Sequence, residues 1–441
     1  MENKIVIGLD IGSTCVCAVA GRIAPKKDRI SLEVLGVGRA NTAGGVVRGA
    51  VVNMNKTVEA IKQAIDAVAN QANLDIESVY ASFSGSQTMS LKQSGTITRN
   101  TNGEEVLKSD IDRLLGDMYK TAVPPGTEIM HVLPMDFTVD GETNIEDPVG
   151  RNGMKLEADF QIITAPLNLA ANTRKCITRT NLLPDEVILS SLASSLAVLL
   201  DDEKEAGVAL VDIGGGTTEI AVYHRNVLRH VAVLPWAGDS ITRDIETGCR
   251  VMLQQAEQLK VKFGNANAND FRTHEVVSVP GLSRQPPKDI MLKNVALIIN
   301  ERLGEIAGLV YTELSRVGYA DKLLGGIVLT GGTALIDGID HTFQRVTGMP
   351  VRIGYPENLD HNLRADLVAD PSFATAIGLV WAGLVPIDPR ISFISNPAKH
   401  SQEPVIQPPA ADTSDKTGRK VVDKFLGLFN SPPTGRETDT Y

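Results

Sequence analysis

The chain has 441 residues, of which 43% are hydrophobic, so it is long enough for about three domains of ~150 residues with packed cores. The net charge of −10 and the isoelectric point near 5.3 argue against a general nucleic-acid-binding protein. The sequence also has no block of Lys and Arg interleaved with aromatic residues. We therefore expect a globular protein with no nucleic-acid partner.

The first motif is the segment GLDIGST at residues 8–14, which lies between two short apolar runs. This pattern predicts a hairpin turn between two buried strands. Glycine lets backbone N–H groups approach phosphate oxygens, and hydroxyl side chains add donors. Gly12, Ser13 and Thr14 are therefore candidate phosphate ligands, and Asp10 is a candidate organiser of catalytic water and of Mg²⁺ held through water. For one such motif alone, an ordinary tight hairpin with an Asp in its turn is the alternative.

Cysteine and histidine usage gives no sign of a metal centre or of disulfides. The four cysteines form no Cys-x-x-Cys motif, and the seven histidines lack ligand spacing. Cys15 and Cys17 alternate on one face of a strand, so we expect both to be small core residues. No signal-peptide pattern precedes the first strand, and we therefore expect a reducing, cytoplasmic compartment.

The pattern of apolar and polar residues changes after about residue 85 and predicts an inserted subdomain. Before it, a capped amphipathic helix is predicted over 56–72. After it, the pattern predicts strands near 128–139 and 154–164 and a helix that begins at a Ser109 cap. These elements indicate a small β-rich subdomain at 86–164.

The segment DIGGGTT at residues 212–218 repeats the first motif, again between apolar runs. Two phosphate loops in the same strand context predict a duplicated, two-lobed clamp around one nucleotide. Asp212 has the role predicted for Asp10. The candidate phosphate ligands of this second loop are Gly214, Gly215, Gly216, Thr217 and Thr218.

Two later segments are candidates for contacts to the nucleoside. A helical pattern over 239–263 places Glu257 and Lys260 three residues apart on one face, although an ordinary surface ion pair is the alternative there. A buried strand then leads into a glycine turn on which an adenine or a ribose could lie flat. The candidate residues of this turn are Gly331, Gly332 and Thr333.

The order of these motifs resembles the actin, sugar-kinase and Hsp70 superfamily, and no P-loop or dinucleotide-binding motif appears. The resemblance implies an α/β fold, duplicated and actin-like (ribonuclease H-like), with two lobes and a small β-rich subdomain inserted in the first. It also implies that ATP and Mg²⁺ bind in the cleft. Actin-like families use a Glu-x-x-Lys face for ribose and adenine.

The insertion resembles that of the FtsA family of bacterial cell-division proteins, through the segments 131–134, 137–140 and 147–150; the segment 46–52 also fits that family. This resemblance extends over residues 4–390 and the tail. It implies a protein that forms filaments with itself on the inner face of the cell membrane at the division septum and tethers the tubulin-like GTPase FtsZ there. In the family, the upper second lobe binds the FtsZ C-terminal peptide, and the insertion contacts neighbouring subunits and later division membrane proteins.

The resemblance and the sequence pattern together predict a division of the chain into ten segments. The core of the first lobe comprises 1–85 and 165–205, and the insertion is 86–164. The core of the second lobe comprises 206–230 and 306–366, and its upper part is 231–305. The rest of the chain is a crossing helix at 367–390 that returns to the first lobe, a flexible linker at 391–417, an amphipathic helix at 418–430 and a disordered tail at 431–441.

The segment 418–430 has the pattern of an amphipathic helix that lies on a membrane surface. A polar linker precedes it, and its basic residues favour an anionic inner membrane. Docking on the protein's own core is the alternative. The apolar face comprises Val421, Val422, Phe425, Leu426, Leu428 and Phe429, and the basic residues are Arg419, Lys420 and Lys424.

Catalysis is less clearly indicated than binding. Actin-like ATPases often carry a Glu or Gln before the second phosphate loop, but the segment 189–193 has neither, so we expect slow ATP hydrolysis or none. Glu219 also departs from the Asp usual in the family and could shift the metal. Three other classes of protein are alternatives: a sugar kinase, an Hsp70-type chaperone and a pilus-assembly actin homologue. The amphipathic tail is the simplest feature by which to distinguish an FtsA-like protein from them.

Overall fold

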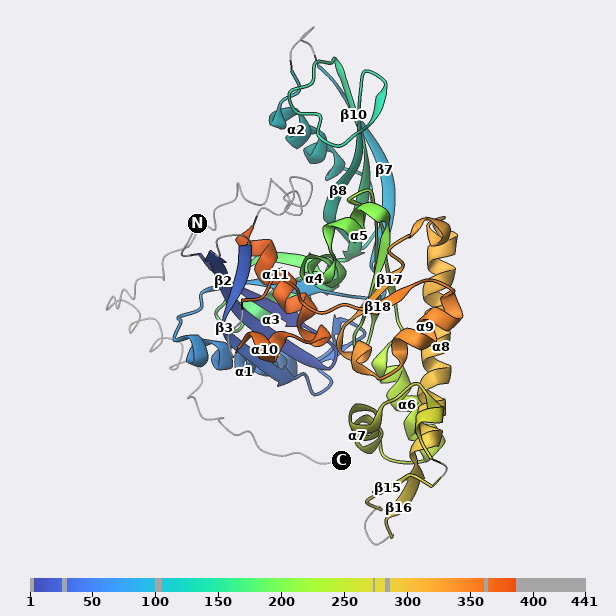
Figure 1. Cartoon of the computed structure of the whole chain (residues 1–441). Helices are drawn as coiled ribbons and strands as arrows, with labels where there is room; N and C mark the ends of the chain where they lie inside the picture. Colours follow the sequence, from blue (N-terminus) through green and yellow to red (C-terminus); the bar gives the residue numbers. More distant parts are fainter. Residues whose placement is uncertain are drawn as a thin grey trace, which may run out of the picture. The chain divides into compact units, whose positions relative to one another are not determined.

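The computed structural model describes residues 4–25, 30–99, 105–272, 274–281, 286–360 and 364–385 (Figure 1). The predicted linker, amphipathic helix and C-terminal tail, residues 391–441, lie outside the described residues. None of the helices within the described ranges is both long and apolar enough to cross a bilayer.

The sheet of the first lobe is built on the hairpin predicted from the first motif. In this hairpin β1 and β2 pair antiparallel, and Ile11 lies opposite Val16 across the turn. The helix α1 (Met54–Ala72) packs on β3, and Asn53 caps it by accepting a hydrogen bond from the backbone N–H of Lys56. The strand order is β11 (Leu183–Leu189), β6 (Ser78–Phe83), β1 (Ile5–Ile11), β2 (Cys15–Pro25) and β3 (Ile30–Asn41).

The sheet of the second lobe has the same topology. In both sheets an antiparallel hairpin is extended on one side by a third antiparallel strand and on the other by two parallel strands. The predicted duplication of the fold is therefore confirmed. The order is β14 (Val227–Leu234), β13 (Thr218–His224), β12 (Val208–Ile213), β17 (Ile327–Thr330) and β18 (Val351–Ile353).

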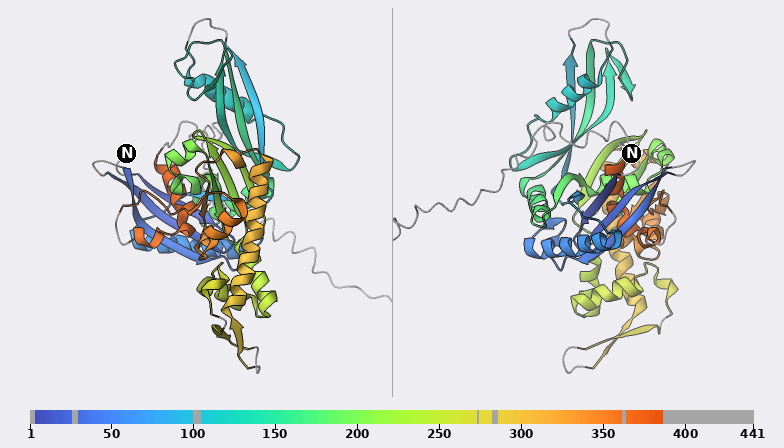
Figure 2. Two further views of the ribbon diagram at one scale, coloured as in Figure 1. Left: turned by 45° about the vertical axis from the view of Figure 1, so that its right-hand side comes forward. Right: turned by 90° about the vertical axis from the view of Figure 1, so that its left-hand side faces the viewer.

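The insertion forms an antiparallel sheet with its own core, and α2 (Lys108–Met118) lies against one face of this sheet (Figure 2). Phe137 and Phe160 from the strands and Leu114 from the helix are fully buried there. The helix does not begin at a Ser109 cap, because the Asp110 carboxylate accepts from the N–H of Leu107 at 2.9 Å and takes over the capping role. The strand order is β7 (Met89–Thr98), β10 (Lys155–Pro166), β8 (Thr127–Val139) and β9 (Glu142–Ile145).

The long helix expected over 239–263 is in fact two helices. α6 (Gly238–Cys249) ends where Arg250 takes a left-handed conformation, with φ at 49°, and α7 (Leu253–Phe263) starts three residues later. Further along, a strand that includes Asp289 comes first, and a long helix begins after it at Leu292. These elements are β15 (Val276–Val279), β16 (Lys288–Met291) and α8 (Leu292–Arg316).

The helix α11 (Ala374–Leu384) packs on α4 (Ser190–Val198) and on the first-lobe strands β1, β2 and β6. A Cβ atom on Gly378 would lie 1.8 Å from the Ala193 carbonyl oxygen, so the two backbones touch. The remaining elements are β4 (Val46–Val47), β5 (Ala50–Val51), α3 (Leu167–Thr178), α5 (Asp201–Ala206), α9 (Ile339–Thr347), α10 (Ala365–Val368) and short 3₁₀ turns at Ala268–Asp270, Ala320–Lys322, Gly332–Leu335 and Pro371–Phe373.

Candidate functional site

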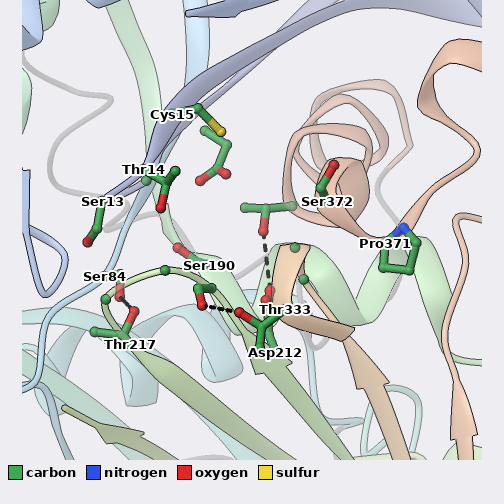
Figure 3. Close-up of a pocket in the computed structure, with 18 of the residues that line it drawn as sticks. Ser13, Thr14, Cys15, Ser84, Ser190, Asp212, Thr217, Thr333, Pro371 and Ser372 are labelled. Atoms are coloured by element: carbon green, nitrogen blue, oxygen red, sulfur yellow. Dashed lines mark hydrogen bonds between the residues drawn. The ribbon is translucent and has the colours of Figure 1, made fainter. Parts of the chain in front are cut away.

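The two glycine motifs meet face to face at a cavity of about 320 Å³ (Figure 3). A Cβ on Gly215 would lie 2.0 Å from the Thr14 hydroxyl oxygen, and a Cβ on Gly216 would lie 2.4 Å from that of Ser13. The loops can therefore approach one another only because the second loop lacks side chains at these positions. Such an arrangement exposes backbone N–H groups and hydroxyls from both lobes to a single ligand.

Hydroxyl groups connect the two lobes around the cavity. The Ser84 and Thr217 hydroxyl oxygens lie 3.1 Å apart and form a buried hydrogen bond between the first and second lobes (Figure 3). The Ser13 hydroxyl accepts from the N–H of Gly49 at 3.0 Å, which holds the first loop against the hairpin of β4 and β5.

Three carboxylates line the cavity, of which Asp212 and Glu219 are buried and Asp10 is partly buried. Asp10, at the end of β1, accepts from the Ser82 hydroxyl at 2.7 Å, and Asp212 accepts from Ser194 at 2.5 Å. Glu219 accepts from the N–H of Ser191 at 3.0 Å. Burial raises the pKa of Asp10 to about 7 and that of Glu219 to about 8, and it also raises the pKa of Asp212.

A cation would fit this donor set, because it would favour the ionised carboxylates that burial disfavours. The described residues contain no group of three His, Cys, Asp or Glu close enough to ligate a metal directly. A cation here would therefore need water or ligand oxygens to complete its shell, as Mg²⁺ commonly does.

The third glycine motif lies against the second phosphate loop. Gly331 has φ at 85°, and a Cβ there would lie 2.4 Å from the Asp212 carboxylate. The Thr333 hydroxyl donates to the Gly214 carbonyl oxygen at 2.7 Å. Gly332 and Thr333 also line the cavity, so this turn and the phosphate loop form one continuous wall.

Glu257 and Lys260 line the cavity from α7, and they form an ion pair at 2.8 Å. The Lys260 ammonium also donates to the Gly238 carbonyl oxygen at 3.1 Å and to the Thr242 hydroxyl at 2.9 Å. The pair therefore ties α7 to the start of α6 at the cavity edge, whereas a simple surface pair would lack these bonds.

Comparison with known proteins agrees with this architecture. The family described as cell division protein FtsA matches residues 209–378, and the family described as the SHS2 domain inserted in FtsA matches residues 85–164. The cell division protein FtsA of Pseudomonas aeruginosa is 36% identical over 91% of this chain and 95% of its own length. The chain belongs to the FtsA family.

Solved structures show the same fold at low identity. The PilM-PilN type IV pilus biogenesis complex is 16% identical with a TM-score of 0.61, covering 88% of this chain and 99% of that chain. MreB5 of Spiroplasma citri bound to ADP is 14% identical with a TM-score of 0.52, covering 86% and 95%. These likenesses show the fold alone, and the actin-like fold class predicted for this FtsA-family chain is confirmed.

The cavity of this FtsA-family chain brings together most of the predicted site residues, with one exception. Asp10, Asp212 and the predicted residues of all three glycine motifs line it, but Thr218 does not. Thr218 is fully buried, and its hydroxyl donates to the Trp236 carbonyl oxygen at 2.6 Å. This side chain supports the start of β13 and does not face the cavity.

Several lining residues were not singled out from the sequence. Ser84 follows β6, Ser190 is the first residue of α4, and Thr375 lies on α11; nothing in their local sequence marks them. Glu219 was noted only as a departure from the Asp usual in the family; in the structure it reaches the N-terminal end of α4, where the segment 189–193 supplies no carboxylate of its own. Glu219 lies opposite Asp212 in the β12–β13 ladder, a pairing that the local sequence does not reveal.

Cys17 is a fully buried core residue, as expected, but Cys15 is not. Cys15 is half-buried and lines the cavity. It is the first residue of β2, directly after the phosphate loop, so one side of it packs against the core that contains Cys17 while the other borders the cavity.

Proposed function

We propose that this FtsA-family chain binds ATP between its two phosphate loops. The observation that carries the proposal is the close approach of Gly215 to Thr14 and of Gly216 to Ser13, which aims donors from both lobes at one cavity. The likeness to MreB5, whose structure is described as bound to ADP, supports a nucleotide ligand. Mg²⁺, held through water by Asp10 and Asp212, would neutralise phosphate charge.

We expect the chain to bind ATP readily but to hydrolyse it slowly or not at all. Within the segment 189–193 only Ser190 lines the cavity, and it offers a hydroxyl rather than a carboxylate or an amide that could orient water. Glu219 reaches this place and accepts from the N–H of Ser191, but burial raises its pKa to about 8, which disfavours the carboxylate form near neutral pH. We therefore expect slow ATP hydrolysis or none.

Calorimetry with ATP and Mg²⁺ tests nucleotide binding. Asn at both aspartates, Asp10→Asn with Asp212→Asn, keeps the shape of each side chain and removes its charge, so Mg²⁺-dependent affinity should fall at least about tenfold. Asp66→Asn, on the exposed face of α1, is the matched control and should bind normally. No uptake by the unaltered chain, or equal uptake by the double variant, contradicts the proposal.

We also propose that the chain is a scaffold of cell division that tethers FtsZ to the inner membrane at the septum. Membership of the FtsA family supports this role. The FtsZ C-terminal peptide would bind within 231–305, and the insertion would serve filament contacts and later division membrane proteins. Hydrogen exchange with the FtsZ peptide should show protection within 231–305, and a scrambled peptide should show none. Protection confined to other segments contradicts this placement.

Membrane attachment is proposed for the helix predicted at 418–430, which lies outside the described residues. Each basic residue contributes about 1 kcal/mol near an anionic leaflet, and each of the six apolar side chains contributes about 1.5 kcal/mol before folding and immobilisation costs. A single tail would therefore bind reversibly. Filament formation would link many tails and strengthen attachment by effective concentration.

Liposome pelleting with anionic vesicles tests this anchor. The full chain should pellet, and a chain ending at Pro389 should remain in the supernatant. Phe425→Asp should reduce pelleting strongly, whereas Asn430→Ser on the polar face should not. Undiminished pelleting of the shortened chain overturns the anchor.

A further inference from the structure

Cys15 is set apart from the other cysteines by its position at the candidate nucleotide site. It follows the first phosphate loop directly, and its carbonyl oxygen closes that loop by accepting from the Gly12 N–H at 3.0 Å. Its side chain is half-buried and faces the cavity that both phosphate loops line (Figure 3). A group attached to the Cys15 sulfur would therefore occupy space within that cavity.

The surroundings of Cys15 favour its thiolate form. The Cys15 and Cys17 sulfur atoms lie 3.6 Å apart, and Arg39 lies opposite Cys17 on the neighbouring strand β3. The hydrogen bond from Cys17 and the positive charge of Arg39 lower the pKa of Cys15 to about 6, against burial and the charge of Asp370. Asp10, on β1, is the other carboxylate that interacts with the Cys15 charge.

The other three cysteines have the opposite character. The hydrogen bond to Cys15, together with burial, raises the pKa of Cys17 well above its ordinary value, so the pair keeps one proton on Cys17. Cys176 and Cys249 are buried on α3 and α6, and burial raises the pKa of both. Because the thiolate is the nucleophile, reactivity should be confined to Cys15.

We propose that Cys15 is a site of reversible S-thiolation by a small disulfide such as oxidised glutathione, and that the attached group excludes nucleotide from the cavity. The Cys15 thiolate attacks one sulfur of the disulfide; a bond forms between these sulfurs as the original S–S bond breaks. The other half leaves as a thiolate and takes a proton from water. Excess free thiol reverses the exchange.

Burial hinders Cys17 from displacing the attached group, although the two sulfur atoms lie 3.6 Å apart. The two cysteines are two residues apart on an extended strand, so their Cα atoms are about 6.6 Å apart, near the upper end of the disulfide range of ~4.4–6.8 Å. The Cys17 side chain is also fully buried in the core. The mixed disulfide at Cys15 should therefore persist rather than convert to an internal disulfide.

The exclusion of nucleotide rests on the nucleotide binding proposed above, but the reactivity of the thiol does not. The full chain is incubated with oxidised glutathione, with and without Mg-ATP, and modified cysteines are mapped by peptide mass spectrometry. Cys15 should be modified at least about tenfold faster than Cys176 or Cys249, and Mg-ATP should slow this reaction severalfold. Calorimetry should find no ATP uptake by the modified chain until free thiol restores it.

Single substitutions test the separate roles of the cysteines. Cys15→Ser should abolish modification and make ATP binding insensitive to the disulfide, whereas Cys176→Ser should change neither. Cys17→Ala removes the donor to Cys15 and should slow the reaction severalfold. Equal labelling of all cysteines, or unchanged ATP uptake after Cys15 is modified, overturns the inference. Selective labelling of Cys15 in a chain that takes up no ATP supports the thiol site and overturns the nucleotide proposal.

Discussion

The carboxylate of Glu219 accepts a hydrogen bond at 3.0 Å from the N–H of Ser191, so β13 of the second lobe is joined to the start of α4. Glu219 also lies opposite Asp212 in the β12–β13 ladder. Burial first, and then the charge of Asp212, raise the pKa of Glu219 to about 8. This contact therefore connects the protonation of the site to the packing of the lobes.

The free energy of unfolding of the nucleotide-free chain should fall as pH rises from about 5 to about 8. A carboxyl whose pKa is higher in the folded state than in the unfolded state binds its proton more tightly when folded. The stability this provides is present at low pH and is lost as pH rises from the ordinary value of 4.5 through about 8. Asp10, whose pKa is raised to about 7, acts in the same direction.

Glu219→Gln should flatten part of this dependence, and it should stabilise the nucleotide-free chain by on the order of 2 kcal/mol near pH 8. Urea unfolding at several pH values measures the effect. Glu59→Gln, on the exposed face of α1, is the matched control and should retain the original slope. If the two variants have the same slope, Glu219 is not the group responsible.

The contact between the two phosphate loops should be sensitive to a single methyl group. Gly215→Ala places a Cβ 2.0 Å from the Thr14 hydroxyl oxygen, so the loops must separate or Thr14 must rotate away. We expect affinity for Mg-ATP to fall by about tenfold or more, with little loss of stability. Gly116→Ala in α2 meets no atom within 4 Å and should leave affinity unchanged while stabilising its helix by up to about 1 kcal/mol. Calorimetry and thermal unfolding distinguish the two effects.

The two threonines of the second loop should have different roles. Thr217→Val removes the hydrogen bond to Ser84 and a hydroxyl that faces the cavity, so Mg-ATP affinity should fall by about tenfold. Thr218→Val leaves the Trp236 carbonyl oxygen without its donor, which should cost about 1 kcal/mol of stability and little affinity. Equal losses of affinity in both variants would show that Thr218 also contacts the ligand.

The features predicted correctly from the sequence are those encoded by neighbouring residues. Each phosphate loop is a continuous segment between two apolar runs, so its hairpin follows from composition and period alone. Cys15 was assigned to the core by the same reasoning, since its strand alternates regularly. The assignment was wrong because burial at the end of a strand depends on what packs there, and at Cys15 it is a cavity.

The features that could not be predicted depend on distant segments or on backbone conformations without a sequence signal. The bond between Glu219 and Ser191 joins a strand to a helix from another part of the chain, and no local pattern indicates it. The break between α6 and α7 occurs at Arg250 in a left-handed conformation, where Gly or Asn is the usual signal. The helical period continues across this break, so a single helix was predicted.

The insertion should be coupled to the second lobe through Asp136 on β8 and Arg229 on β14. Their side chains form a two-point ion pair, with one of its hydrogen bonds 3.1 Å long, and are 35% and 11% exposed. Breaking this partly buried pair with Asp136→Asn should cost about 1–3 kcal/mol, because the Arg229 guanidinium then keeps only its bond to the His224 carbonyl oxygen and lacks a carboxylate partner. The exposed pair of Asp117 and Lys120 is the control, and Asp117→Asn should cost less than about 0.5 kcal/mol.

Exchanging the charges of Asp136 and Arg229 shows whether a loss of stability comes from the broken ion pair or from general damage to the fold. The double variant Asp136→Arg with Arg229→Asp restores opposite charges, so it should recover part of the stability lost in either single variant. Urea unfolding measures the coupling free energy across this cycle, and raised salt should reduce it less than for a fully exposed pair. Strictly additive losses in the double variant would mean that the contact does not couple the insertion to β14. A positive coupling would make β14 a direct connection between the insertion and the sheet that carries the second phosphate loop.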